Sequence, residues 1–184
     1  MITILLPEIH EIYNPEDRTF TEVNWKEKTL HLEHSLVSVQ KWEQKWHKPF
    51  LGKEEKTLEQ QMYYIKCMAV DGKLTDTDIR RLTQDDIKRI NDYILDPATA
   101  TWFANNGREI GKDKVIITAE RIYGQMVGYR IPFECKKWHL NSLMTLIRVC
   151  AENNKPRKKM RKQDIYDKYD AINRANKAKY HTKG

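Results

Sequence analysis

Cysteine, glycine and proline are all scarce in this chain. Three cysteines, seven glycines and six prolines occur among its 184 residues. An odd number of cysteines without a Cys-x-x-Cys pair argues against a secreted disulfide scaffold and for a reducing compartment. So little glycine and proline excludes a collagen-like or low-complexity chain. The length then allows one domain with an appendage, or at most two small domains.

Long apolar runs are also missing. No run approaches the roughly 18 residues that a membrane-crossing helix needs, so we expect no membrane segment and no membrane partner. The apolar stretch at residues 2–6 follows no basic region and stops at Pro7. A signal peptide needs both a basic start and a longer apolar run, so we do not interpret this stretch as one.

Complete catalytic and metal-binding motifs are absent as well. Residues 107–113 are one residue shorter than a phosphate-binding loop and end in an acid where that loop has Ser or Thr. Cys135 and His139 have the spacing of two zinc ligands on a helix, but no second pair accompanies them. A Cys–His nucleophile is the remaining enzymatic interpretation, although Cys150 lies on an apolar stripe where thiols are usually inert. We therefore expect no enzyme, no metal and no cofactor.

Positive charge is concentrated at one end of the sequence. Residues 155–184 contain eleven Lys and Arg against three Asp, so they carry +8 and the preceding 154 residues sum to −1. A solvated terminus explains this excess about as well as an arm that contacts nucleic acid or another acidic surface. In the second interpretation the contact residues are Lys155, Arg157, Lys158, Lys159, Arg161 and Lys162.

The first part of the chain has the pattern of β-strands. Apolar residues at 2–6, and leucines alternating with polar residues at 29–33, are typical of strands. The sequence NPED at residues 14–17 favours a turn, because proline presets the backbone and Asn and Asp bond to nearby peptide groups. This turn joins residues 11–13 to residues 18–23, so we predict a small antiparallel sheet.

From Ser35 onward the apolar residues recur at helical spacing. The first predicted helix ends at Lys48-Pro49, and Thr57 with Gln60 forms a capping box that begins the second. Further helices are expected after Thr75, Thr83 and Thr118. The predicted core stripes are Leu36, Val39, Trp42 and Trp46; Leu58, Met62, Ile65 and Ala69; and Leu140, Leu143, Met144, Ile147 and Cys150.

The aromatic residues around the end of the first helix have two interpretations. Trp42 and Trp46 fit the core stripe, but an exposed tryptophan pair is a common anchor for a protein partner. Trp46 and Phe50 flank the helix end and are our prediction for exposed anchors, with Trp42 beside them.

Several stretches of the chain resemble a protein family of tailed bacteriophages. They are EHSLVS at residues 33–38, KWE at 41–43, WHKPF at 46–50, IPFEC at 131–135, KWHLN at 137–141, LIRV at 146–149 and KPRKKM at 155–160. The family belongs to the tail module and is identified as a tail assembly chaperone or structural protein. The resemblance covers most of the chain from residue 30 onward and includes no catalytic motif.

The resemblance implies a non-enzymatic protein that binds the tape-measure protein in the cytoplasm of the infected bacterium while the tail tube polymerises. The alternatives are a structural subunit of the virion and a nucleic-acid-binding phage protein, and self-association is compatible with each. The expected fold is mainly α. We predict a β element at residues 1–34 packed on a helical body at 35–154, and a basic helical appendage at 155–184.

Overall fold

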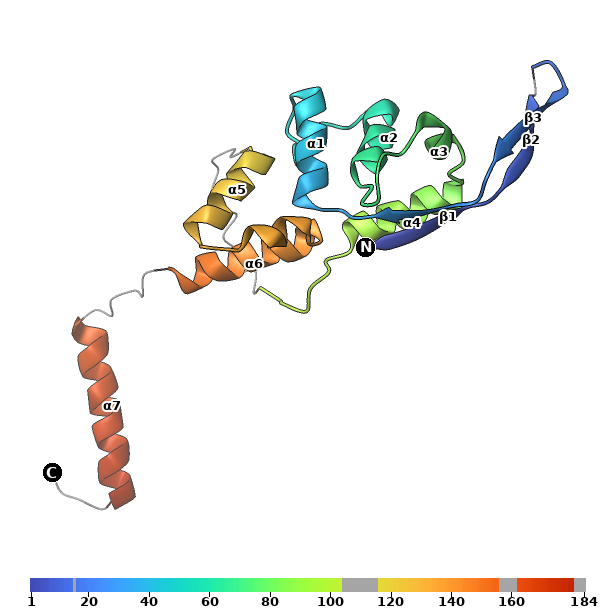
Figure 1. Ribbon diagram of the computed structural model, residues 1–184. Coiled ribbons are helices and arrows are strands. Elements are labelled where there is room, and N and C mark those ends of the chain that lie inside the picture. Colours follow the sequence, from blue (N-terminus) through green and yellow to red (C-terminus); the bar gives the residue numbers. More distant parts are fainter. Residues whose placement is uncertain (15, 104–115, 156–161, 181–184) are drawn as a thin grey trace. The chain divides into compact units, whose positions relative to one another are not determined.

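The computed structural model describes residues 1–14, 16–103, 116–155 and 162–180. These residues form four strands, seven α-helices and one 3-10 helix (Figure 1). The chain divides into two units, Met1–Ala151 and Glu152–Gly184. The fold is mainly α with a small N-terminal β element, in agreement with the mainly α class predicted from the sequence.

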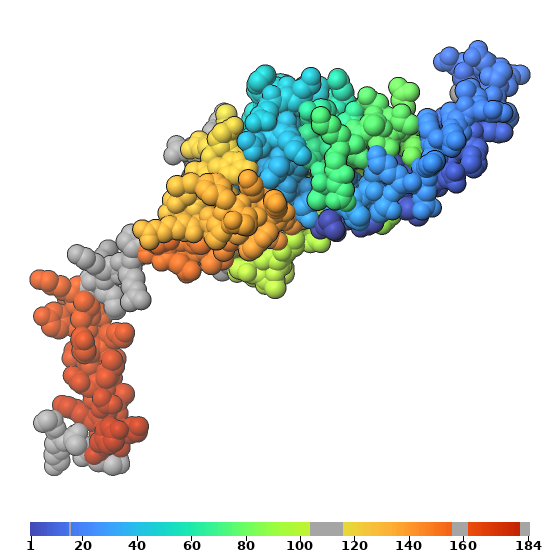
Figure 2. All heavy atoms as spheres, viewed as in Figure 1, coloured from blue at the N-terminus to red at the C-terminus, as the bar shows by residue number. Residues whose placement is uncertain are grey.

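The β element is a two-stranded ribbon in two halves. β1 (Ile2–Leu6) pairs antiparallel with β4 (Lys28–Leu32), and β2 (Ile9–Asn14) pairs antiparallel with β3 (Thr19–Trp25). The predicted single sheet is therefore two small sheets. The β1–β4 half buries apolar side chains in the core, whereas the β2–β3 half is largely exposed and protrudes from the first unit (Figure 2).

A buried arginine holds the junction between the two halves. Arg81 is 9% exposed, and its guanidinium donates hydrogen bonds to the backbone carbonyls of Pro7 and Lys26. Asp78, one helical turn earlier, accepts a hydrogen bond of 2.6 Å from Lys28. Two charged side chains thus bind the residues that connect the two halves of the ribbon.

The next four helices begin as local sequence predicts. They are α1 (Leu36–Trp46), α2 (Leu58–Cys67), α3 (Asp76–Arg80) and α4 (Gln84–Leu95). Each has a capping box, in which the N-cap hydroxyl and the side chain three residues later satisfy backbone N–H groups of the first turn. The N-cap residues are Ser35, Thr57, Thr75 and Thr83.

The predicted stripe of α2 is partly wrong. Leu58 is 69% exposed, while Tyr64 and Cys67 are buried beside Ile65. Tyr64 stacks on Phe50 with ring centroids 4.1 Å apart, and this contact lies on a different side of the helix from Leu58. The long-range contacts of Tyr64 therefore determine the rotation of α2.

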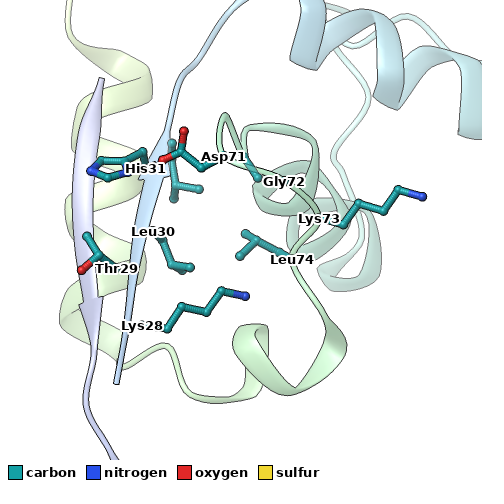
Figure 3. Close-up of a pocket in the computed structure, with 10 residues that line it drawn as sticks. Lys28, Thr29, Leu30, His31, Asp71, Gly72, Lys73 and Leu74 are labelled. Atoms are coloured by element: carbon teal, nitrogen blue, oxygen red, sulfur yellow. Dashed lines mark hydrogen bonds and ion pairs between the residues drawn. The ribbon is translucent and has the colours of Figure 1, made fainter. Parts of the chain in front are cut away.

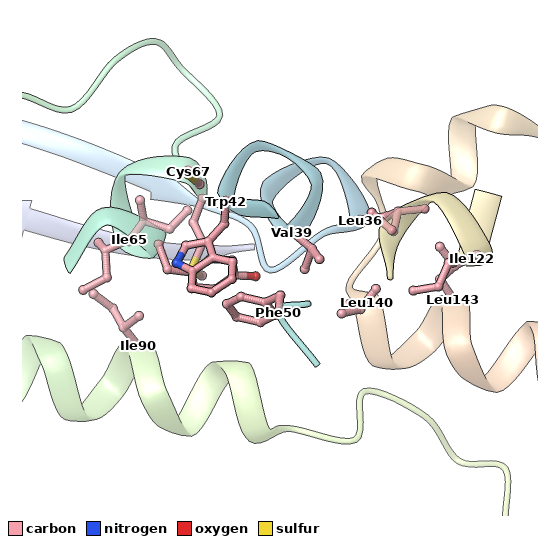
Figure 4. Packing of buried hydrophobic residues seen from close by; sticks show 14 of the residues in the cluster. Leu36, Val39, Trp42, Phe50, Ile65, Cys67, Ile90, Ile122, Leu140 and Leu143 are labelled. Carbon is pink, nitrogen blue, oxygen red and sulfur yellow. The ribbon is translucent and has the colours of Figure 1, made fainter. Parts of the chain in front are cut away.

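Two further elements, α5 (Ala119–Gly128) and the 3-10 helix η1 (Phe133–Lys137), pack against α1. They are followed by α6 (Leu140–Asn153). Figure 4 shows Leu36 close to Ile122, Leu140 and Leu143. The last two residues, with Ile147, confirm the core stripe predicted for α6.

The second unit contains α7 (Lys162–Tyr180), which is 19 residues long. None of its residues is buried. This helix lies within the predicted basic appendage.

Candidate functional site: partner-binding surfaces

The residues predicted as exposed anchors lie mostly in the core. Trp42 is 2% exposed and donates a hydrogen bond of 2.9 Å from Nε1 to the carbonyl of Gln60. Phe50 is 8% exposed and contacts the Trp42 ring edge-on, with centroids 5.2 Å apart (Figure 4). Trp46 is half-buried against Tyr63. Trp42 and Phe50 are therefore packing residues, and their prediction as exposed anchors is wrong.

Other aromatic side chains are exposed instead. Trp102, Phe20 and Tyr13 are 94%, 68% and 51% exposed. Tyr13 and Phe20 face each other across the ribbon, with ring centroids 5.2 Å apart. Because they are paired directly across the ladder, they lie on one face of the ribbon. The sequence analysis did not single out either residue.

A buried polar cluster lies between β4, α1 and α2. His34 Nδ1 is 2.5 Å from the Tyr64 hydroxyl, and the Ser38 hydroxyl donates to the carbonyl of Ser35 at 2.7 Å. Burial, with His139 nearby, lowers the pKa of His34 to about 4. Burial also raises the pKa of Tyr64. Both groups are therefore neutral at pH 7, and the cluster holds the core together.

Cys135 and His139, the pair considered in the sequence, do not form a nucleophilic pair. The Nε2 atom of His139 donates to the carbonyl of Tyr93 at 2.9 Å, and its Nδ1 accepts from the backbone N–H of Asn141 at 3.3 Å. Both ring nitrogens thus contact the backbone, and Cys135 is only 4% exposed. Burial raises the pKa of Cys67 to about 11, so this thiol stays protonated at neutral pH.

Metal and phosphate sites were considered in the same way. In the part of the chain that the structure describes, no three His, Cys, Asp or Glu side chains come together as a metal site would require. The loop at residues 107–113, which superficially resembles a phosphate-binding loop, lies outside the described residues.

One pocket is too small for an organic ligand. It lies between β4 and residues 71–74 and has a volume of about 40 Å³ (Figure 3). The Nδ1 atom of His31 forms a hydrogen bond with the Asp71 carboxylate at its edge. A space of this size accommodates one or two water molecules.

A larger hollow is lined by lysines and lies between α1, α2 and the loop that follows α2. We call it the lysine groove. Its volume is about 510 Å³, and its lining residues are Lys41, Gln44, Lys45, Tyr63, Lys66, Cys67, Gly72, Lys73 and Leu74. Lys41 and Lys45 stand one turn apart on the exposed face of α1. Lys73 points away from β4 in Figure 3, and it follows Gly72, whose φ of +120° suits glycine.

The lysine groove has an excess of positive charge. Four lysines and no acid are among its lining residues. Lys66 forms an ion pair with Asp76, which lowers the pKa of that carboxyl. Within the described residues, Lys41, Lys45 and Lys73 form no ion pair. Several positive charges close together on one surface attract an anionic partner.

The predicted basic contact residues lie in the second unit. Lys155 forms an ion pair with Glu152 at 2.5 Å, and Lys162 is exposed at the start of α7. Arg157, Lys158, Lys159 and Arg161 lie outside the described residues. Helix α7 itself has five cations and three acids, so it is only mildly basic.

No protein-family model, curated protein or solved structure matches this chain. Among the described residues, no helix combines the length and apolar character that crossing a bilayer requires.

Proposed function

We propose that this chain is a non-enzymatic assembly protein of a phage tail, and that it binds the tape-measure protein as a tail assembly chaperone in the infected bacterium. The resemblance described above supports the phage assignment. The structural observation that supports partner binding is the apolar stripe on α7, which no other described part of the second unit covers.

Helix α7 has the pattern of a segment that binds a groove or another helix. Ile165, Tyr169 and Ile172 follow one another at spacings of four and three residues and are 38%, 61% and 44% exposed. A lone helix of this length is marginal in water, because most helical stability in proteins comes from packing an apolar face. A partner that covers the stripe supplies this packing.

The size of the stripe suits a reversible contact. Burying a fully exposed large apolar side chain contributes about 1.5–3 kcal/mol, so these three partly exposed ones contribute at most roughly 5–9 kcal/mol. Ordering the helix on binding costs about 2–5 kcal/mol of this. The remaining few kcal/mol give weak binding, as expected for a chaperone that leaves once assembly is complete.

Co-expression with the tape-measure protein tests the proposal. The full chain should recover that protein in a pull-down. The triple variant Ile165→Ala, Tyr169→Ala and Ile172→Ala should lose most of it. The control changes Asp167 and Arg174 to Ala on the opposite side of α7, which leaves the net charge and the apolar stripe unchanged.

Two results contradict the proposal. If the triple variant binds as well as the wild type, α7 is not the binding segment. If the full chain recovers no tape-measure protein and mass spectrometry finds the chain abundant in purified virions, the chain is a structural subunit of the tail.

A nucleic-acid-binding function is the second candidate, favoured by the eleven cations at residues 155–184. Nonspecific binding to DNA should then weaken steeply between about 50 and 200 mM salt. Tight binding of one DNA sequence at physiological salt would favour this function over the chaperone. The three acids at Asp164, Asp167 and Asp170 argue for a weak, nonspecific contact instead.

A further inference from the structure

The protruding half of the ribbon has a face with unbalanced charge. Glu11 lies directly opposite Glu22, and Tyr13 lies directly opposite Phe20. Residues opposite each other, and residues two apart on one strand, point to the same side, so these four side chains share one face. We call it the acidic ribbon face. Like charges directly opposite each other destabilise a strand pair.

Nothing within the described residues neutralises this pair of glutamates. Both are exposed, and neither forms an ion pair there. The aromatic pair next to them is also more than half exposed. A two-stranded ribbon without further strands is only marginally stable in water. Its exposed glutamates favour a cationic partner, and its exposed aromatic pair favours a partner that also covers apolar surface.

The lysine groove has the complementary charge. Lys41, Lys45 and Lys73 line it without an acid, and Tyr63 adds an aromatic surface. The ribbon and the groove belong to the same unit, but in Figure 1 β2 and β3 extend away from α1, where Lys41 and Lys45 lie. Arg81 holds the base of the ribbon in this direction. The two surfaces therefore cannot meet within one copy.

We propose that the acidic ribbon face of one copy docks in the lysine groove of a second copy. In this contact Glu11 and Glu22 face Lys41, Lys45 and Lys73, and the Tyr13–Phe20 pair covers the apolar part of the groove. The two surfaces differ, so a contact made in one direction only is heterologous and builds a ring or an open chain. If two copies exchange their ribbons, the result is a symmetric pair. This inference goes beyond the proposed function, because it uses neither α7 nor its partner.

Charge reversal on each side tests the contact. Sedimentation velocity of the full chain at about 50 mM salt should show association that weakens as salt rises. The ribbon variant Glu11→Lys with Glu22→Lys should weaken association about tenfold or more, and the groove variant Lys41→Glu with Lys45→Glu should do the same. A chain carrying all four changes should associate nearly as well as the wild type.

A matched control separates this contact from net charge. Glu55→Lys with Asp92→Lys makes the same charge change as the ribbon variant, at exposed positions outside both surfaces, and should leave association unchanged. All the substituted residues are exposed, and a thermal melt checks that each variant folds.

Three results overturn the proposal. The first is a wild-type chain that stays monomeric at about 50 mM salt and the highest soluble concentration. The second is a four-residue variant that does not recover association when the ribbon variant has lost it. The third is association that depends on residues 155–184, tested with a chain ending at Asn154, because the basic appendage is then the partner of the glutamates.

Discussion

Replacing Glu43 with glutamine should destabilise the first unit, although the two side chains have nearly the same shape. Glu43 is 8% exposed at the end of α1. Its Oε1 accepts the backbone N–H of Phe50 at 2.8 Å, and its Oε2 accepts the backbone N–H of Ala119 at 2.8 Å. Thr118, the N-cap residue of α5, makes no side-chain cap hydrogen bond. The carboxylate of Glu43 therefore caps α5 from a position 76 residues away in sequence.

The expected magnitude follows from these two bonds. A hydrogen bond to a charged group contributes about 1.5–3 kcal/mol, and a buried donor left without an acceptor costs a similar amount. Glutamine keeps one acceptor oxygen and places an NH₂ group against the other N–H, so Glu43→Gln should cost about 2–3 kcal/mol. For a unit of this size, 1 kcal/mol corresponds to roughly 2–4 °C, which predicts a Tm lower by about 4–12 °C.

Thermal unfolding followed by circular dichroism measures this change, and hydrogen exchange locates it. The amides of Phe50 and Ala119 should lose protection in the variant. Glu120→Gln is the control, since it makes the same substitution in the exposed first turn of α5 and should cost less than about 1 kcal/mol. A Glu43→Gln protein that melts within about 1 °C of the wild type, with both amides still protected, would refute the reasoning.

Four further perturbations have defined outcomes. Burial holds the pKa of His34 at about 4 against 6.5 for the unperturbed group. The wild type should therefore lose about 1.4 kcal/mol per pH unit as pH falls from 6.5 to 4, and urea titrations of His34→Gln should lack this part of the slope. Trp42→Ala should cost about 3–5 kcal/mol in urea unfolding, and an unchanged midpoint would contradict its assignment to the core. Arg81→Ala should increase hydrogen exchange in the protruding ribbon while α5 and α6 stay protected. A chain ending at Asn154 keeps all of α6, so its Tm should stay within a few degrees of the wild type and its low-salt DNA binding should fall; unfolding would mean that the appendage belongs to the core.

Local sequence was sufficient for the parts of the fold that depend on near neighbours. The helix starts at Ser35, Thr57, Thr75 and Thr83 were predictable, because a capping box involves residues only three apart. The turn between β2 and β3 was predictable because it depends on adjacent residues. The mainly α class was predictable because apolar residues recur at helical spacing. Composition alone also placed the excess of positive charge at residues 155–184.

Tertiary structure decided which faces are buried and which charges meet. Trp42 and Phe50 were candidate anchors in the sequence, and only the packing of α2 against α1 showed that they lie in the core. The groove lysines come from two helices and a loop, and their spacing along the chain does not predict that they lie together. In the sequence, Glu43 is an ordinary charged helix residue. Only the fold brings the start of α5 next to it. Each of these features depends on contacts between residues far apart in sequence, whereas propensity and periodicity report only on neighbours a few residues away.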